Sequence, residues 1–194
     1  MGTRHLIMAV KDGKTRLAQY GQWDGYPSGQ GVDVLKFVSS KQRRAKLSKV
    51  LDKVQFLTQA DLDRGYEKVG VQKGAFGLNK KQSDSFNRMF PLLSRDHGAN
   101  ILTLLLSADK PQLVNSEEFA GDSLFCEWAY VIDFDKQTFE VYKGFNTSEP
   151  LDKHDRFFGT KNDNKKYYPI KMIADWKFDE IPSRAKFFEY LADC

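Results

Sequence analysis

The sequence predicts an α+β fold in which helices pack on a mostly antiparallel β-sheet. Strand-like segments pair around short turns near both ends of the chain, and helical segments fill the middle. The chain has 194 residues, of which 41% are hydrophobic, so one domain can bury a sizeable core. We therefore expect a single globular domain over residues 1–194.

A β-hairpin is the first predicted element. The apolar run from Leu6 to Val10 does not alternate with polar residues, which indicates a strand buried on both faces. This burial favours a layer on each side of the sheet, as in a layered αββα arrangement. Asp12-Gly13 predicts a two-residue turn, because both residues tolerate positive φ angles.

The turn also predicts a pairing register, in which Lys11 lies opposite Lys14. Continued toward the N-terminus, this register gives three pairs: Thr3 with Gln22, Arg4 with Gly21 and His5 with Tyr20. The start of the chain is then expected beside a glycine-rich segment, residues 20–31.

The middle of the chain is predicted to be mostly helical. A helix is expected over 31–38, and an amphipathic helix follows with apolar residues from Leu47 to Leu57 at helical spacing. Thr58 and Asp61 form a capping box for a further short helix. Glycines predict loop over much of 65–79. Helices are also expected from Lys80 to about Pro91 and over 101–107, where a buried strand is the alternative.

The second half of the chain reads mainly as sheet. Alternating apolar residues predict a strand over 127–134, Asp135-Lys136 a turn, and 138–143 the return strand. Another strand is expected within 167–178 and a helix over 183–191. The polar stretch 146–164 is long for a plain connection, which is typical of a functional loop.

Composition narrows the function classes. The chain has no apolar run long enough to span a membrane and no signal-peptide pattern near its start. Cys126 and Cys194 are too few for a disulfide framework and lack metal-ligand spacing. We expect a cytoplasmic protein with no membrane partner, no cofactor and no metal; its oligomeric state stays open.

Two charged patterns have alternative interpretations. Residues 41–53 carry six cations and one acid, Asp52. The cations lie opposite the apolar face and no aromatic residues are interleaved, which favours a solvated helix face over nucleic-acid contact. Asp96-His97 and His154-Asp155 together are a remote metal-ligand alternative.

The glycine-rich segment 20–31 is the main candidate site, because Gly and Pro exclude regular structure while large aromatic residues need a partner. Gly29-Gln30-Gly31 before a helix is typical of a backbone cradle for an anion. Tight structural packing, with Trp23 and Tyr26 in the core, is the alternative. The predicted ligand-binding residues are Arg4, His5, Tyr20, Gln22, Trp23, Asp24, Tyr26, Ser28 and Gly29.

Arg4 can hold a phosphate or carboxylate bidentately, or pair with Asp24 in a structural bridge. His5 can transfer protons, or be buried against Tyr20. No catalytic residue is assigned.

The segments Gly2-Thr3-Arg4, Gln22-Trp23-Asp24-Gly25-Tyr26-Pro27-Ser28-Gly29 and 128–133 resemble an uncharacterised family of proteins from bacteriophages, bacteria and fungi. The resemblance covers both ends of the chain and implies a viral or mobile-element protein. A looser resemblance is to N-terminal-nucleophile hydrolases, which begin on a buried strand. Those enzymes need Cys, Ser or Thr as their first residue, whereas Gly2 follows Met1 here.

The leading hypothesis is therefore a protein that binds a small anionic ligand, such as a nucleotide. A phage-type protein could use this binding to sequester a signalling nucleotide of its host. The alternatives are a hydrolase that uses His5, Asp24 or Thr3 in the same pocket, and a protein-interaction module without a ligand.

Overall fold

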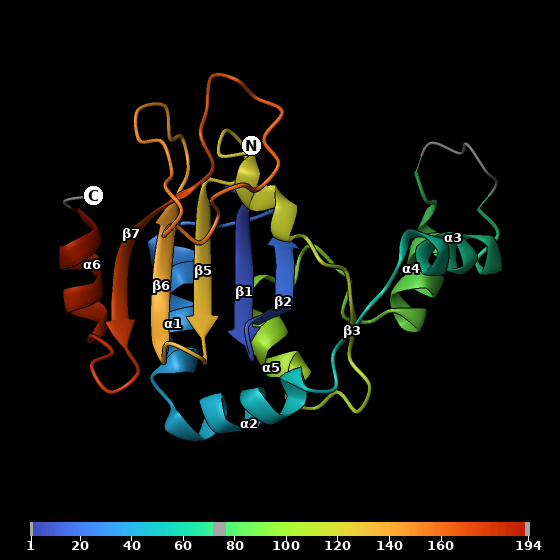
Figure 1. Cartoon of the computed structure of the whole chain (residues 1–194). Helices are drawn as coiled ribbons and strands as arrows, with labels where there is room; N and C mark the ends of the chain where they lie inside the picture. The colour runs from blue at the N-terminus through green and yellow to red at the C-terminus, as the bar shows by residue number, and fades with distance from the viewer. Residues whose placement is uncertain (1, 72–76, 193–194) are drawn as a thin grey trace.

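A computed structural model describes residues 2–71 and 77–192, and it has one five-stranded sheet in the order β2-β1-β5-β6-β7 (Figure 1). The strands are β1 (His5–Lys11), β2 (Lys14–Gly21), β5 (Trp128–Asp133), β6 (Thr138–Lys143) and β7 (Lys171–Lys177). Only the β1–β5 pair within this sheet is parallel. The predicted α+β class with a mostly antiparallel sheet is confirmed.

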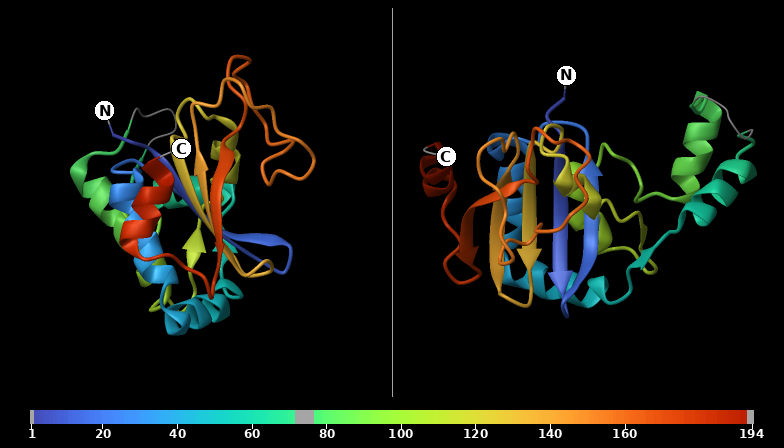
Figure 2. Two further views of the ribbon diagram at one scale, coloured as in Figure 1. Left: turned by 90° about the vertical axis from the view of Figure 1, so that its left-hand side faces the viewer. Right: turned by 45° about the horizontal axis from the view of Figure 1, so that its top comes forward.

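The α-helices that pack on this sheet cover one face, while irregular chain and the short 3-10 helix η3 (Glu117–Gly121) cover the other (Figure 2). The helical elements are η1 (Pro27–Gly31), α1 (Val32–Val38), α2 (Lys41–Leu51), α3 (Gln59–Lys68), α4 (Lys80–Met89), η2 (Gly98–Asn100), α5 (Ile101–Leu105), η3 (Glu117–Gly121) and α6 (Arg184–Ala192). α1 and α5 lie behind the sheet, and α2 runs along its lower end in Figure 1. None of the helices in the described ranges is long and apolar enough to cross a bilayer.

The first strand is buried on both faces, as its apolar run predicts. Ile7 and Ala9 belong to the core on the helical side, whereas Leu6 and Met8 belong to a second core on the opposite side. That second core is closed by irregular chain, including Phe157. The described residues form no second sheet stacked on the first, so the expected αββα layering is wrong: loops cover the face where a second sheet was expected.

The first hairpin has the predicted turn but a different register. Asp12 and Gly13 both have positive φ angles, 55° and 66°. The pairing then shifts between Val10, opposite Thr15, and Ala9, opposite Leu17. A β-bulge therefore places His5 opposite Gly21 instead of Tyr20. The start of the chain still lies beside the glycine-rich segment, because Gly25 N–H donates to Thr3 O at 2.9 Å.

Helix α2 ends at Leu51, so the predicted continuation to Leu57 is wrong. Strand β3 (Gln55–Phe56) instead pairs with β4 (Gln112–Leu113), because a parallel partner satisfies the backbone there. The Thr58 capping box is confirmed. The predicted loop over 65–79 is helical as far as Lys68, and part of it lies outside the described residues.

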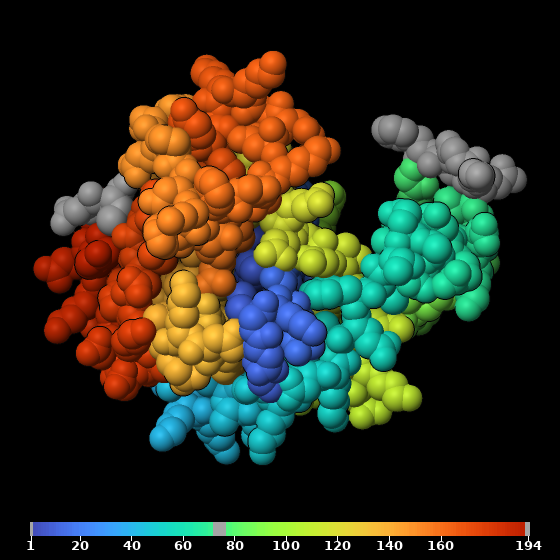
Figure 3. Space-filling view, in the orientation of Figure 1, coloured from blue at the N-terminus to red at the C-terminus, as the bar shows by residue number. Residues whose placement is uncertain are grey.

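Helices α3 and α4 stand away from the sheet as a helical arm (Figures 1 and 3). The two helices pack through Tyr66 and Phe86, whose stacked rings lie 4.6 Å apart. The remaining predicted elements are confirmed: α5 is a helix, β6 has the predicted limits, β5 and β7 lie within the predicted ranges, and α6 is shifted by one residue.

Candidate functional site

The glycine-rich segment forms a tightly packed corner at the upper end of the sheet. Two hydrogen bonds join its backbone to other parts of the protein, Gly25 N–H to Thr3 O and Tyr130 Oη to Gly25 O, both at 2.9 Å. A third, from Gln30 N–H to Asp24 O at 2.9 Å, lies within the segment. The Gln30 side chain also accepts from Ala99 N–H at 2.6 Å. The packing gives many of these residues a structural role, so a ligand is not needed to explain the glycines.

Asp24 lies at the start of the helical turn that leads into α1. Its backbone has a positive φ of 55°, and its carboxylate packs so closely on Gly29 that a Cβ there would clash with Oδ2. Burial, followed by the negative charge of Asp24, raises the pKa of Tyr130. The predicted anion cradle at Gly29 therefore faces a carboxylate of the protein itself, which disfavours a second anion there.

His5 lies inside the protein, only 1% exposed, against Gly21. Neither imidazole nitrogen makes a well-formed hydrogen bond within the described chain. Burial lowers the pKa of His5 to about 4, and the backbone of Thr3 offsets only part of this effect. His5 is thus neutral at neutral pH and out of reach of a ligand, like Thr3, which is 7% exposed.

Trp23 and Tyr26 of this segment are not buried in the core. Trp23 and Tyr26 are 51% and 50% exposed, and Ser28 is exposed as well. Trp23 Nε1 donates to Asp96 Oδ1 at 2.9 Å. Tyr20 Oη donates to Gln22 Oε1 at 2.5 Å. The core-packing alternative for Trp23 and Tyr26 is wrong.

The side chain of Arg4 lies over the ring of Phe125. Its guanidinium carbon lies 4.5 Å from the centroid of that ring, an arrangement that favours a cation–π contact. Its backbone N–H donates to Glu127 Oε1 at 3.2 Å. Within the described ranges the guanidinium has no carboxylate partner, so the alternative of an Arg4–Asp24 bridge is not formed.

Phe125, over which Arg4 lies, also lines a hollow of about 480 Å³ between η3 and the loop residues 161–165. Phe125 is 44% exposed, which leaves part of its ring free for a ligand. The residues that line this hollow are Glu118, Asp122, Phe125, Lys161, Asn162, Asp163, Asn164 and Lys165. We call it the Phe125 hollow.

The far wall of the Phe125 hollow comes from a loop with a defined shape. Asn164 N–H donates to Asn162 Oδ1 at 2.9 Å, and Lys166 N–H donates to Asn164 Oδ1 at 3.0 Å. The Asn162 side chain also donates to Tyr167 O. These bonds fix the backbone that carries Lys161 and Lys165.

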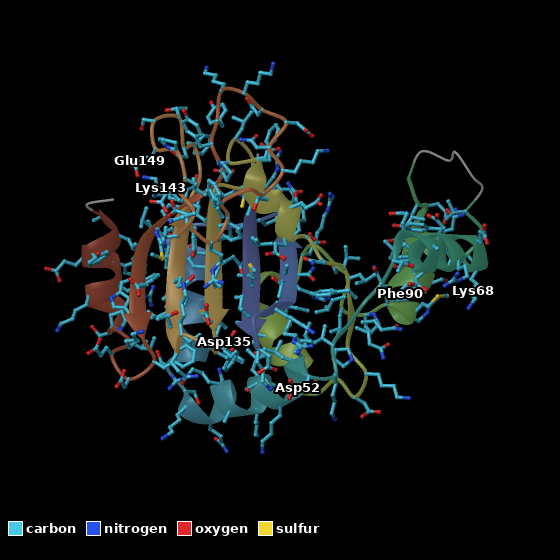
Figure 4. All side chains as sticks on the ribbon, viewed as in Figure 1. Asp52, Lys68, Phe90, Asp135, Lys143 and Glu149 are labelled. Carbon is cyan, nitrogen blue, oxygen red and sulfur yellow. The ribbon has the colours of Figure 1, made fainter. Side chains whose placement is uncertain are left out.

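The same loop is anchored to the sheet by a buried ionic cluster. Arg156 contacts Asp133 at 2.5 Å and Glu140 at 2.8 Å, and both acids are almost fully buried. Tyr142 Oη donates to Glu140 Oε2 at 2.7 Å. Burial alone would raise the pKa of Asp133, but hydrogen bonds from Lys136 and Arg156 outweigh it and lower that pKa. Lys143 and Glu149, labelled in Figure 4, lie at the upper end of the sheet, beside the start of this loop.

Phe125, Lys161 and Lys165 carry almost no signal in the sequence that would mark them as site residues. The length and polarity of 146–164 are the one indication, and that stretch contains Lys161 but ends one residue before Lys165. The metal alternative is not supported, because no three His, Cys, Asp or Glu side chains meet as a metal site in the described part of the chain. Asp96 instead contacts Trp23, and Asp155 contacts Lys171.

Comparisons with models of protein families, with curated proteins and with solved structures found no match to this chain.

Proposed function

We propose that this protein binds a small anionic ligand with a planar group, of the nucleotide type, in the Phe125 hollow beside Arg4. The main observation in its support is that the guanidinium of Arg4 lies over the half-exposed ring of Phe125. This guanidinium has no carboxylate partner among the described residues. The proposal keeps Arg4 from the sequence prediction but moves the pocket from the glycine-rich corner to the Phe125 hollow.

The chemistry of the lining residues suggests how such a ligand lies. A base or other flat ring stacks on Phe125, and Lys165 of the lining approaches a phosphate or carboxylate. Arg4, which is not itself a lining residue but lies over the Phe125 ring, reaches the same anionic group from the edge of the hollow. Glu118 and Asp122 accept hydrogen bonds from sugar hydroxyl groups or amino groups. Because the hollow contains acids as well as cations, a ligand with both an anionic group and several donors fits better than inorganic phosphate.

Binding without turnover is the form of this function that we favour. The hydrolase alternative relied on His5, Thr3 or Asp24, and the first two are buried. Sequestration of a signalling nucleotide is a biological use of such binding that suits a phage-type protein.

A thermal-shift screen with mono-, di- and cyclic nucleotides tests the proposal. We expect at least one nucleotide to raise the melting temperature of the wild-type protein and not of Phe125→Ala, which loses the stacking surface. Phe145→Ala is the matched control, because Phe145 is also an exposed Phe, at 52%. No shift with any nucleotide, or equal shifts in Phe125→Ala, contradicts the proposal.

A protein-interaction module is the second candidate, favoured by exposed aromatic residues. Phe145, Phe158 and Tyr168 are 52%, 56% and 41% exposed. Aromatic residues of this kind are enriched at protein interfaces. Failure of the nucleotide screen together with co-purification of a defined protein partner that Phe158→Ala releases would favour this candidate.

A further inference from the structure

We propose that the outer face of α2 binds the phosphate backbone of a nucleic-acid duplex without reading its sequence. This surface lies along the lower end of the molecule in Figures 1 and 3, away from the Phe125 hollow. The inference does not depend on the proposed ligand site.

The inner face of α2 is apolar and buried, whereas its outer face is positively charged and exposed. Leu47 and Leu51 are fully buried against the core. The outer face carries exposed lysines at Lys41, Lys46 and Lys49, and Lys53 follows just beyond the end of the helix. None of the side chains of these four lysines makes a hydrogen bond or an ion pair with another described residue.

Asp52, the only acidic residue among residues 41–53, already has a cation as its partner. Both carboxylate oxygens of Asp52 lie 2.6 Å from Lys11 Nζ, which also donates to Ser48 O (Figure 4). A solvated helix face with balanced charge would pair such an acid with its own lysines. Here Asp52 is paired with β1 instead, and the positive charge of the α2 lysines favours a polyanion as partner.

A hollow of about 300 Å³ continues the cationic surface at the N-terminal end of α2. Lys36 and Arg43 line it together with Asn100 and Thr103, and Asp33 is the acidic residue of its lining. The guanidinium of Arg43 lies 5.9 Å from the centroid of the Phe37 ring. The hollow therefore adds two cations and two neutral polar side chains, a set of groups that suits a phosphate.

The spacing and the side-chain types favour a duplex over other polyanions. Lys46 and Lys49 are three residues apart on α2 and therefore lie on one side of it, and Lys53 follows two residues after the helix ends. None of the exposed large apolar side chains of the described chain lies on α2. The face thus lacks aromatic residues to stack unpaired bases and apolar residues to enter a bilayer.

Fluorescence anisotropy with a short labelled DNA duplex tests this inference across a range of salt concentrations. One variant carries Lys46→Gln, Lys49→Gln and Lys53→Gln. The matched control carries Lys68→Gln, Lys80→Gln and Lys81→Gln, which removes the same charge from exposed lysines of the α3–α4 arm. Thermal melts first establish that both variants are folded.

We expect the wild-type protein to bind the duplex at low salt, with an affinity that falls steeply as salt rises. The α2 variant should bind more weakly, with a log–log slope shallower by about 0.9 for each phosphate that it no longer neutralises. The arm variant should retain the wild-type slope. Absence of duplex binding at low salt, equal weakening in both variants, or stronger binding to single strands or anionic vesicles overturns the proposal.

Discussion

Gly21 and His5 face each other across β1 and β2 so closely that a Cβ at position 21 would clash with His5 Nε2. The His5 ring is buried, with only 1% of the residue exposed. The bulge in β2 creates this pairing, since it shifts the register by one residue. Gly21 is therefore required by the position of the imidazole.

Gly21→Ala should lower the free energy of unfolding by about 1–3 kcal/mol, the usual cost of overpacking a dense core. Urea denaturation measures this change. Gly13→Asn is the control, because nothing lies near that turn position and Asn tolerates its positive φ. A Gly21→Ala protein as stable as the wild type would show that the close packing of His5 on Gly21 is not present in solution.

Lowering the pH from neutral should destabilise the protein through His5. The folded protein holds His5 with a pKa of about 4, whereas the unfolded chain has the ordinary value of 6.5. Between these values the unfolded state binds more protons, so stability falls as pH decreases from about 6.5 to 4. The total decrease in the free energy of unfolding is about 3 kcal/mol.

Urea melts of the wild type and of His5→Leu across this pH range measure the effect. The His5→Leu protein should lose most of the pH dependence in this window, even if it is less stable throughout. His154→Gln, a change at an exposed histidine, should keep it. An unchanged pH slope in His5→Leu would exclude His5 as the source.

Arg156→Met should destabilise the fold by about 3–5 kcal/mol, because it leaves Asp133 and Glu140 buried without their cation. Arg16→Met removes a more exposed ion pair with Asp12, at 3.5 Å, and should cost less than about 1 kcal/mol. Chemical denaturation compares the two variants. Equal destabilisation would mean that the buried cluster does not anchor the loop.

Trp23→Ala should cost more stability than Arg4→Ala. The Trp23 ring packs on Gly2 and its Nε1 donates to Asp96, whereas the Arg4 side chain contacts mainly one ring. Half of the Trp23 surface is exposed, so we expect a decrease of about 1–2 kcal/mol for Trp23→Ala and under about 1 kcal/mol for Arg4→Ala. Thermal melts of the two variants measure the order.

Much of the fold could be predicted because local patterns agree with it. The run from Leu6 to Val10, the Asp12-Gly13 turn and the alternation in β5 each determine a strand or turn with no help from distant residues. The bulge could not be predicted. Arg16 is the extra residue of β2, between Thr15 and Leu17, and nothing in its residue type distinguishes it from an ordinary strand residue. The end of α2 could not be predicted either, because β3 depends on a partner far along the chain, at residues 112–113.

Only part of the candidate site could be predicted from the sequence. The hairpin pattern placed Arg4 near the glycine-rich segment, but the direction of a long side chain depends on its three-dimensional neighbours. Phe125 and Lys165 are more than a hundred residues away from Arg4 and share no motif with it. The proximity of Phe125 to Arg4 results from the parallel pairing of β1 with β5, which sequence periodicity does not specify.

Isothermal titration calorimetry of Arg4→Ala and Arg184→Ala tests the central claim most directly. The ligand is the nucleotide that gives the largest thermal shift. Arg184 also lies over an aromatic ring, that of Phe188 at 5.4 Å, and belongs to α6 at a different edge of the sheet. We predict that Arg4→Ala weakens binding by about 1.5–3 kcal/mol, roughly ten- to more than a hundredfold, while Arg184→Ala binds like the wild type. Wild-type affinity in Arg4→Ala would contradict a ligand site at Arg4 and Phe125.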